Sequence, residues 1–128
     1  ESREQPSACP VDLPGAMGRF DNDRVFYKEM LDEFIRQIPE QLSSLTEAFK
    51  AGDPERLRIS AHRIKGSAGT LSATNLQALA LAIETKGREK DVAGAARLVE
   101  ELRAEIARLS EFALSFDPGT ELPLADTV

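Results

Sequence analysis

DPERLRISAHRIKGSAGTL, residues 53–71, contains the start, the buried face and the end of one predicted helix. Asp53 is a residue type that commonly caps helix N-termini, and Pro54 suits the first helical position. The apolar residues that follow recur at helical intervals and form one stripe: Leu57, Ala61, Ile64, Ala68 and Leu71. A helix with one such stripe is stabilised when the stripe is buried against other helices. We expect this helix to fray near residues 71–73.

The segment before this helix has the same period. An N-terminus is expected near residues 21–23, where Asp and Asn side chains can cap free amide groups. Apolar residues continue in phase from Met30 to Phe49 on both sides of Pro39. We therefore expect either one helix kinked at this proline or two nearly collinear helices, with Gly52 as the stop.

Two further helices are expected after residue 73. Thr74 is the predicted cap of a helix that ends near Gly87, and Asp91 is the predicted cap of the last helix. The last helix has a regular seam of apolar residues from Val92 to Ala113. Each of these segments therefore has one face suited to burial.

The pattern as a whole predicts an all-α fold, because no segment alternates apolar and polar residues as a strand does. Four amphipathic helices with short links indicate an antiparallel up-down four-helix bundle. A short extra N-terminal helix is expected within residues 11–20, capped by Asp12. Residues 1–10 are expected to be a flexible linker and residues 115–128 a disordered C-terminal tail. The bundle domain is therefore expected over residues 11–114.

Composition narrows the possible functions. The 128 residues suffice for one domain, and the net charge of −6 disfavours binding to nucleic acid or to anionic membrane surfaces. The single cysteine, Cys9, can form no intrachain disulfide, and one histidine with one cysteine makes a zinc site unexpected. The chain shows no signal peptide and no apolar run of about 18 residues. We expect a cytoplasmic protein, and its first residue, Glu1, suggests a piece of a longer one.

One stripe of the helix at residues 53–71 carries unusual residues for a surface. His62, Lys65, Gly66 and Gly69 lie at positions i, i+3, i+4 and i+7, beside the buried face. We therefore expect His62 at the surface, within reach of another protein. Because a glycine inside a helix costs about 1 kcal/mol relative to alanine, the two glycines indicate a flat patch for a closely approaching partner. An imidazole is a nucleophile near neutral pH, and Lys65 puts positive charge where a transferred phosphoryl group would lie.

The run HRIKGSAG, residues 62–69, resembles the signature of histidine-containing phosphotransfer domains, and the similarity extends over roughly residues 12–114. The resemblance implies that His62 is the phosphoacceptor. It also implies that Lys65 stabilises the phosphoryl group and that Gly66 leaves room for the partner's active site.

Two more positions enter through the resemblance. Members of the family commonly have an acid or amide one helix later that orients the histidine, and Glu84 occupies the matching position. A hydrogen bond to the imidazole nitrogen that is not phosphorylated is therefore predicted, direct or through water. An ion pair with Arg88 is a competing interpretation of Glu84. The family often has glycine after the residue matching Leu71, whereas this chain has Ser72, which puts the local turn geometry in question.

The function that the resemblance implies is a phosphorelay. A receiver-domain aspartate would pass a phosphoryl group to His62, and another receiver aspartate would take it. The chain would be a carrier without turnover of its own, with no cofactor and with Mg²⁺ on the receiver. Arg58 and Arg63 would line the docking surface together with Gly66 and Gly69. A monomer is expected. A second candidate partner is a histidine kinase in the same polypeptide, which would then be a hybrid sensor kinase anchored in the inner membrane.

Three other functions stay open at this point. The N-terminal phosphoacceptor domain of a chemotaxis-type kinase has the same fold and differs in its donor, which flanking sequence would decide. The dimerisation helices of a sensor kinase usually have Glu after the histidine and Pro a few residues later, whereas Arg63 follows His62 here. A helical adaptor bundle without phosphorylation is disfavoured by the presence of both His62 and Lys65.

Overall fold

The computed structural model describes residues 9–119, and within this range every regular element is a helix. The elements are α1 (Leu13–Arg19), α2 (Arg24–Ala51), α3 (Pro54–Thr70), α4 (Thr74–Arg88), the short 3₁₀ helix η1 (Ala93–Ala95) and α5 (Ala96–Ser115). The all-α prediction is therefore confirmed for the described part of the chain. None of its helices combines the length and the apolar character needed to span a bilayer.

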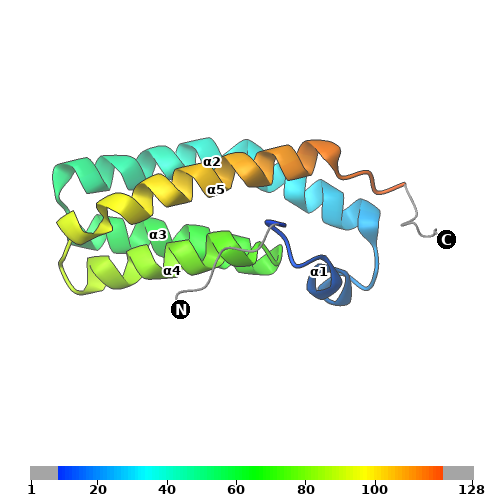
Figure 1. Ribbon diagram of the computed structural model, residues 1–128, viewed down its shortest axis with the longest axis horizontal. Helices are drawn as coiled ribbons and strands as arrows, with labels where there is room; N and C mark the ends of the chain where they lie inside the picture. Colours follow the sequence, from blue (N-terminus) through cyan, green and yellow to red (C-terminus); the bar gives the residue numbers. More distant parts are fainter. Residues whose placement is uncertain (1–8, 120–128) are drawn as a thin grey trace.

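Helices α2 to α5 form a four-helix bundle. Each packs on the next, α2 on α3, α3 on α4 and α4 on α5, and α5 closes the ring by packing on α2. Figure 1 shows α2 and α5 in one layer and α3 and α4 in the other, with successive helices running in opposite directions. This is the predicted antiparallel up-down arrangement. The extra helix α1 lies at the end of the bundle where α2 begins and α3 ends.

Local capping residues fix the starts of α1, α2 and α3 and the end of α2. Asp12, Asp23 and Asp53 each accept a hydrogen bond from the backbone amide three residues on, at 3.0 to 3.2 Å. Gly52 ends α2 with a left-handed φ of 67°, a conformation that costs glycine little. Between these ends α2 continues through Pro39 as a single helix, so the one-helix alternative is confirmed.

Two predicted caps are wrong in position. Ala73 is the N-cap of α4, without a side-chain hydrogen bond, and Thr74 is the first helical residue. The amide of Ala73 donates to the carbonyl of Ala68 at 2.9 Å, so the closure of α3 sets where α4 begins. Asp91 does accept a hydrogen bond from the amide of Gly94 at 3.0 Å, but this bond lies at the start of η1, and α5 begins only at Ala96.

Apolar side chains from all four bundle helices fill the centre of the molecule. The largest fully buried side chains are Tyr27, Leu31, Ile38, Leu45, Leu57, Ile64, Leu76, Ile83, Leu102 and Leu109. Tyr27 is the polar member of this set, and its hydroxyl donates to the carbonyl of Leu71 at 2.7 Å. This bond satisfies the buried hydroxyl and connects α2 to the end of α3.

The packed region extends beyond the predicted limits of residues 11–114. Phe116 is 8% exposed and lies edge-on to the ring of Tyr27, with ring centroids 5.7 Å apart. Pro10 is buried as well. Phe116 and Pro10 bury apolar surface against the core, and this burial holds these flanking residues in place. The outer parts of the predicted linker and tail, residues 1–8 and 120–128, lie outside the described residues.

Candidate functional site

His62 lies on the outer side of α3. Its neighbours Ala61 and Ile64 are fully buried, so the helix turns the imidazole away from the core. The side chain of His62 is 63% exposed. The surface position expected from the sequence is therefore present, and another protein can reach the ring.

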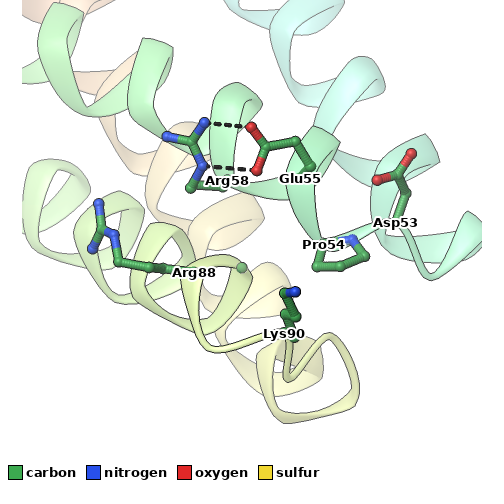
Figure 2. Close-up of a pocket in the computed structure, with 7 residues that line it drawn as sticks. Asp53, Pro54, Glu55, Arg58, Arg88 and Lys90 are labelled. Carbon is green, nitrogen blue, oxygen red and sulfur yellow. Dashed lines mark hydrogen bonds and ion pairs between the residues drawn. The ribbon is translucent and has the colours of Figure 1, made fainter.

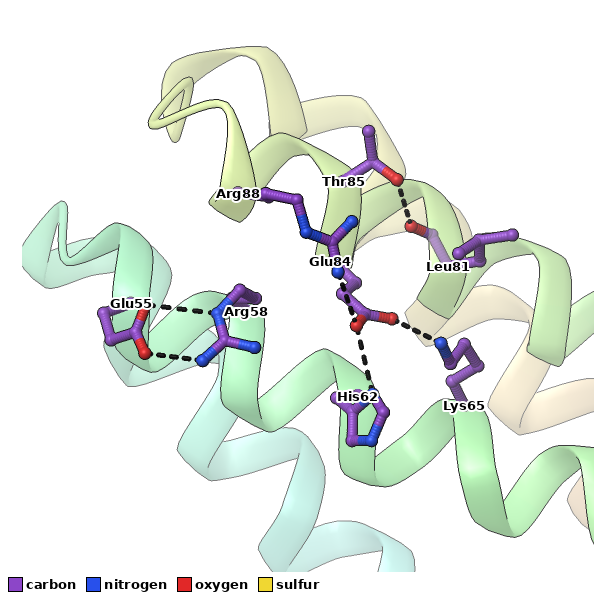
Figure 3. A network of polar contacts seen from close by, with 8 residues as sticks. All are labelled: Glu55, Arg58, His62, Lys65, Leu81, Glu84, Thr85 and Arg88. Carbon is purple, nitrogen blue, oxygen red and sulfur yellow. Dashed lines mark hydrogen bonds and ion pairs between the residues drawn. The ribbon is translucent and has the colours of Figure 1, made fainter.

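Glu84 of α4 lies directly beside the imidazole, as Figure 3 shows. Its Oε2 is 3.0 Å from Nδ1 of His62, and its side chain is only 3% exposed. Glu84 is buried because it belongs to the face of α4 that packs against α3, together with Ile83 and Gly87. The contact between His62 and Glu84 that the resemblance implied is thus present and direct.

Two more basic side chains contact the same carboxylate. Lys65 Nζ is 2.8 Å from Oε1 of Glu84, and Arg88 Nη2 is 3.1 Å from Oε2. The ion pair with Arg88, considered above as a competing interpretation, therefore coexists with the contact to His62. Lys65 is paired with Glu84 as well. Burying a carboxylate is costly unless it is paired, and here three basic groups surround it.

The charge of Glu84 determines which imidazole nitrogen is available. Burial raises the pKa of Glu84, but the contacts with Lys65 and His62 outweigh burial and hold this pKa below its ordinary value of 4.5. At neutral pH Glu84 is therefore ionised, and an ionised carboxylate only accepts hydrogen bonds. Nδ1 of His62 must then carry the proton that faces Glu84. In the neutral ring this leaves a free electron pair on Nε2, which can act as a nucleophile.

The two glycines of the predicted patch have different surroundings. A Cβ on Gly66 would meet nothing within 4 Å, so the surface of α3 is open there. A Cβ on Gly69 would lie 2.7 Å from Nε2 of Gln77 on α4. Gly69 therefore lies next to a side chain of α4, whereas Gly66 does not, and one flat patch with both glycines stays a prediction.

The predicted rim residues lie near the site but differ in their contacts. Arg58 is one turn before His62, and its Nε donates to Oε1 of Glu55 at 3.1 Å. Arg63 is exposed. Figure 2 shows Arg58 and Arg88 at a pocket where α3 begins and α4 ends, with the lining residues Asp53, Pro54, Glu55, Arg58, Gly87, Arg88 and Lys90. Basic side chains therefore gather around the carboxylate that contacts His62.

Two features of this surface were not predicted from the sequence. Ile59 and Leu81 are large apolar side chains that stay 43% and 47% exposed, each three residues before a site residue on its helix. A Cβ on Gly87 would lie 2.8 Å from the carbonyl oxygen of Pro54, so this glycine lets α4 approach the start of α3. A single sequence carries no signal for a close approach of two helices, and Gly87 was interpreted only as a helix end.

The described residues offer no donor set for a metal. Within residues 9–119, no group of three or more His, Cys, Asp or Glu side chains could hold an ion. The site provides instead a nucleophilic nitrogen, an acceptor that fixes its tautomer, and nearby positive charge. These are parts suited to carrying a phosphoryl group, where positioning and charge matter most.

Comparison with known proteins identifies the family. The Hpt domain family model matches residues 29–112, a range that includes His62, Lys65 and Glu84. Among solved structures, the chain is similar to histidine-containing phosphotransfer protein B (HptB) from Pseudomonas aeruginosa PAO1, with a TM-score of 0.72 and 28% identity over 84% of this chain and 94% of that chain. No match was found among curated proteins. The chain therefore belongs to the Hpt domain family and is a histidine phosphotransfer module of a phosphorelay.

Proposed function

We propose that His62 carries the phosphoryl group of this module, that the group attaches to Nε2, and that receiver domains supply and remove it. The observation that supports this most strongly is the 3.0 Å contact between Nδ1 of His62 and the buried carboxylate of Glu84. That contact occupies one ring nitrogen and leaves the other as the nucleophile. The 63% exposure of the side chain gives a partner access to it.

The proposed transfer needs no base to remove a proton. Nε2 attacks the phosphorus of an aspartyl phosphate, the N–P bond forms, and the bond from phosphorus to the aspartate oxygen breaks with its electron pair on that oxygen. Nδ1 keeps its proton throughout and donates a hydrogen bond to Glu84. Transfer to a second receiver aspartate is the reverse process. In this proposal the chain is a carrier, and Mg²⁺ belongs to the receiver.

Positive charge around His62 supports the binding of an anionic group. Lys65 lies one turn after His62 and Arg58 one turn before it, so both can approach a phosphoryl group on Nε2. To bind the phosphoryl oxygens, Lys65 would have to leave its present partner Glu84. Arg58 would likewise have to leave Glu55. Such exchanges replace one charge-assisted hydrogen bond by another, which keeps their cost small.

The same surface is suited to a protein partner. The open helix surface at Gly66 lets another backbone approach, and Ile59 and Leu81 add exposed apolar area. Arg63 and Arg58 are proposed as polar contacts around this area, in the usual arrangement of an apolar centre with a charged rim. Domains of this family interact with receiver domains, and we propose that a receiver docks here.

The donor and the setting belong to the proposal as well. A kinase domain as donor, in the manner of chemotaxis-type kinases, is the second candidate. A parent hybrid kinase, a cytoplasmic location and a monomeric state stay predictions from the sequence.

Label transfer tests the proposed function. The full chain is incubated with a phosphorylated receiver domain and Mg²⁺, beside His62→Gln, which removes the nucleophile at an exposed position. We expect acid-labile, alkali-stable label on the native chain and none on H62Q. Phosphorus–nitrogen coupling in NMR spectra of ¹⁵N-labelled chain should assign the bond to Nε2. Label on Nδ1, or equal label on H62Q, would overturn the assignment. Labelling by a kinase domain alone would support the chemotaxis-type alternative.

A further inference from the structure

The charged groups that face Glu84 are all basic. His62 and Lys65 approach it from α3, and Arg88 approaches it from its own helix, α4. The charge of Glu84 in turn acts on Arg58, also on α3, as the smallest of the effects that raise the pKa of Arg58, after its hydrogen bond with Glu55. With 3% of its side chain exposed, Glu84 has little water around it. Its negative charge lies 3.0 Å from Nδ1, close enough to act on the imidazole although Lys65 and Arg88 pair with the same carboxylate.

We infer that the negative charge of Glu84 keeps a proton on Nδ1 of the phosphorylated His62, so that the ring departs as neutral imidazole when the phosphoryl group moves on. This inference rests on the proposed function and extends it from the unmodified to the phosphorylated state. Glu84 then positions a proton and sets how readily the phosphohistidine donates its phosphoryl group.

The chemistry of the outgoing step explains why this proton matters. When the Nε2–P bond breaks, its electron pair stays on Nε2 while a new bond forms between phosphorus and a carboxylate oxygen of the receiver. With a proton on Nδ1, the ring that leaves is neutral. Without that proton, the ring would leave as the imidazolate anion, a far poorer leaving group. No proton has to move during the transfer itself.

Replacing Glu84 by glutamine would remove the negative charge and keep an acceptor for the hydrogen bond from Nδ1. The carbonyl oxygen of Gln can accept a hydrogen bond from Nδ1 as the carboxylate does, but it carries no net charge. A nearby opposite charge shifts a pKa by about 1 to 3 units in favour of the charged form. Glu84→Gln should therefore lower the pKa of Nδ1 in phosphohistidine by about one unit or more.

The experiment begins with chemical phosphorylation of the full chain by phosphoramidate, so that loading does not depend on a receiver. Transfer to one receiver domain with Mg²⁺, and hydrolysis to inorganic phosphate, are then followed between pH 5 and pH 10 for the native chain and E84Q. Glu89→Gln is the matched control, because it removes a carboxylate from the exposed end of the same helix. The same receiver serves all three chains, so its own pH dependence cancels.

We expect transfer from E84Q to decline at a pH about one unit below the decline of the native chain, with E89Q matching the native chain. Coinciding midpoints for the native chain and E84Q would overturn the inference. Failure of receiver transfer with normal chemical loading would contradict the proposed function instead, and the hydrolysis profile would still test the charge of Glu84.

A second measurement needs no variant and covers the case in which E84Q does not fold. The pKa of Nδ1 in phosphorylated His62 is read by ¹⁵N NMR in the native chain and in the same chain unfolded in urea. The inference requires a higher pKa in the folded chain, since only there does Glu84 lie beside the ring. An equal or lower pKa in the folded chain would refute it.

Discussion

Gly66 and Gly87 are both helical glycines, yet a methyl group at each would meet opposite surroundings. At Gly66 it would extend into open space, whereas at Gly87 it would lie 2.8 Å from the carbonyl oxygen of Pro54 and 2.9 Å from the backbone nitrogen of Arg58. Backbone atoms cannot move aside as a flexible side chain can. The first glycine is therefore dispensable for the fold, and the second is required by it.

Alanine substitutions at these glycines should change stability in opposite directions. Gly66→Ala removes the entropic disadvantage of glycine and should raise the free energy of unfolding by about 0.5 to 1 kcal/mol. Gly87→Ala forces α3 and α4 apart and should lower it by about 1 to 3 kcal/mol. Urea unfolding followed by circular dichroism measures both. Equal effects of the same sign would contradict the difference in packing.

A larger side chain at Gly66 should block the approach of a partner without lowering the stability of the fold. Gly66→Leu should fold at least as well as the native chain, because leucine favours helix and no neighbour obstructs it. It should still accept phosphate from phosphoramidate on His62, but it should accept it from a receiver at least tenfold more slowly. Unimpaired receiver transfer would show that docking does not use the surface at Gly66.

At the scale of elements, the turn between α3 and α4 is where the N-terminal segment joins the bundle. Ser72 holds a left-handed φ of 57°, the conformation for which glycine is the usual residue. Its carbonyl accepts from the amide of Asp12 at 2.8 Å, and its hydroxyl accepts from Nε of Arg19 at 3.3 Å. The departure from the family's glycine therefore keeps the turn and adds a side-chain contact to α1.

Two substitutions at Ser72 test this interpretation. Both Ser72→Gly and Ser72→Ala lose the hydroxyl contact with Arg19, but only alanine retains the cost of a left-handed backbone, about 1 to 2 kcal/mol. S72G should therefore be more stable than S72A by about 1 kcal/mol, and thermal unfolding of both measures the difference. If S72A equals S72G, the turn is not held in the left-handed region in solution.

What the sequence can predict at this scale depends on the range of the interaction. Asp53 was identified as a cap, and Asp23 lies in the range expected for one, because a cap contacts the amide three residues on. Thr74 was misplaced because the start of α4 depends on how the turn after α3 closes. Glu84 lies 22 residues from His62, so their contact depends on the relative position of two helices and was reached only through the family resemblance. The pairing of Lys65 with the same carboxylate was not foreseen.

At the scale of the whole molecule, charge is distributed unevenly. The chain has a net charge of −6, yet Arg58, Lys65 and Arg88 lie near His62. Exposed acidic residues such as Glu47 and Glu100 lie on α2 and α5, in the other layer of the bundle. An acidic protein can thus present a basic surface to an anionic partner. Its association with such a partner should weaken as salt rises, because exposed charges are screened.

Stability should depend on pH through Glu84. Its pKa is lower in the folded chain, because the contacts with Lys65 and His62 outweigh burial, so its ion pairs stabilise the fold above its ordinary pKa of 4.5. This stabilisation is lost as pH falls through the lowered pKa. Glu84→Gln should therefore be less stable than the native chain at pH 7, and the difference should shrink towards pH 3. A hydrogen bond with Arg36 also lowers the pKa of Glu33, and one with Arg58 lowers the pKa of Glu55. The native chain and E84Q share these contacts, so they cancel in the difference between the two. Urea unfolding at each pH gives the two free energies, and a difference that stays constant down to pH 3 would show that Glu84 has no lowered pKa in the fold.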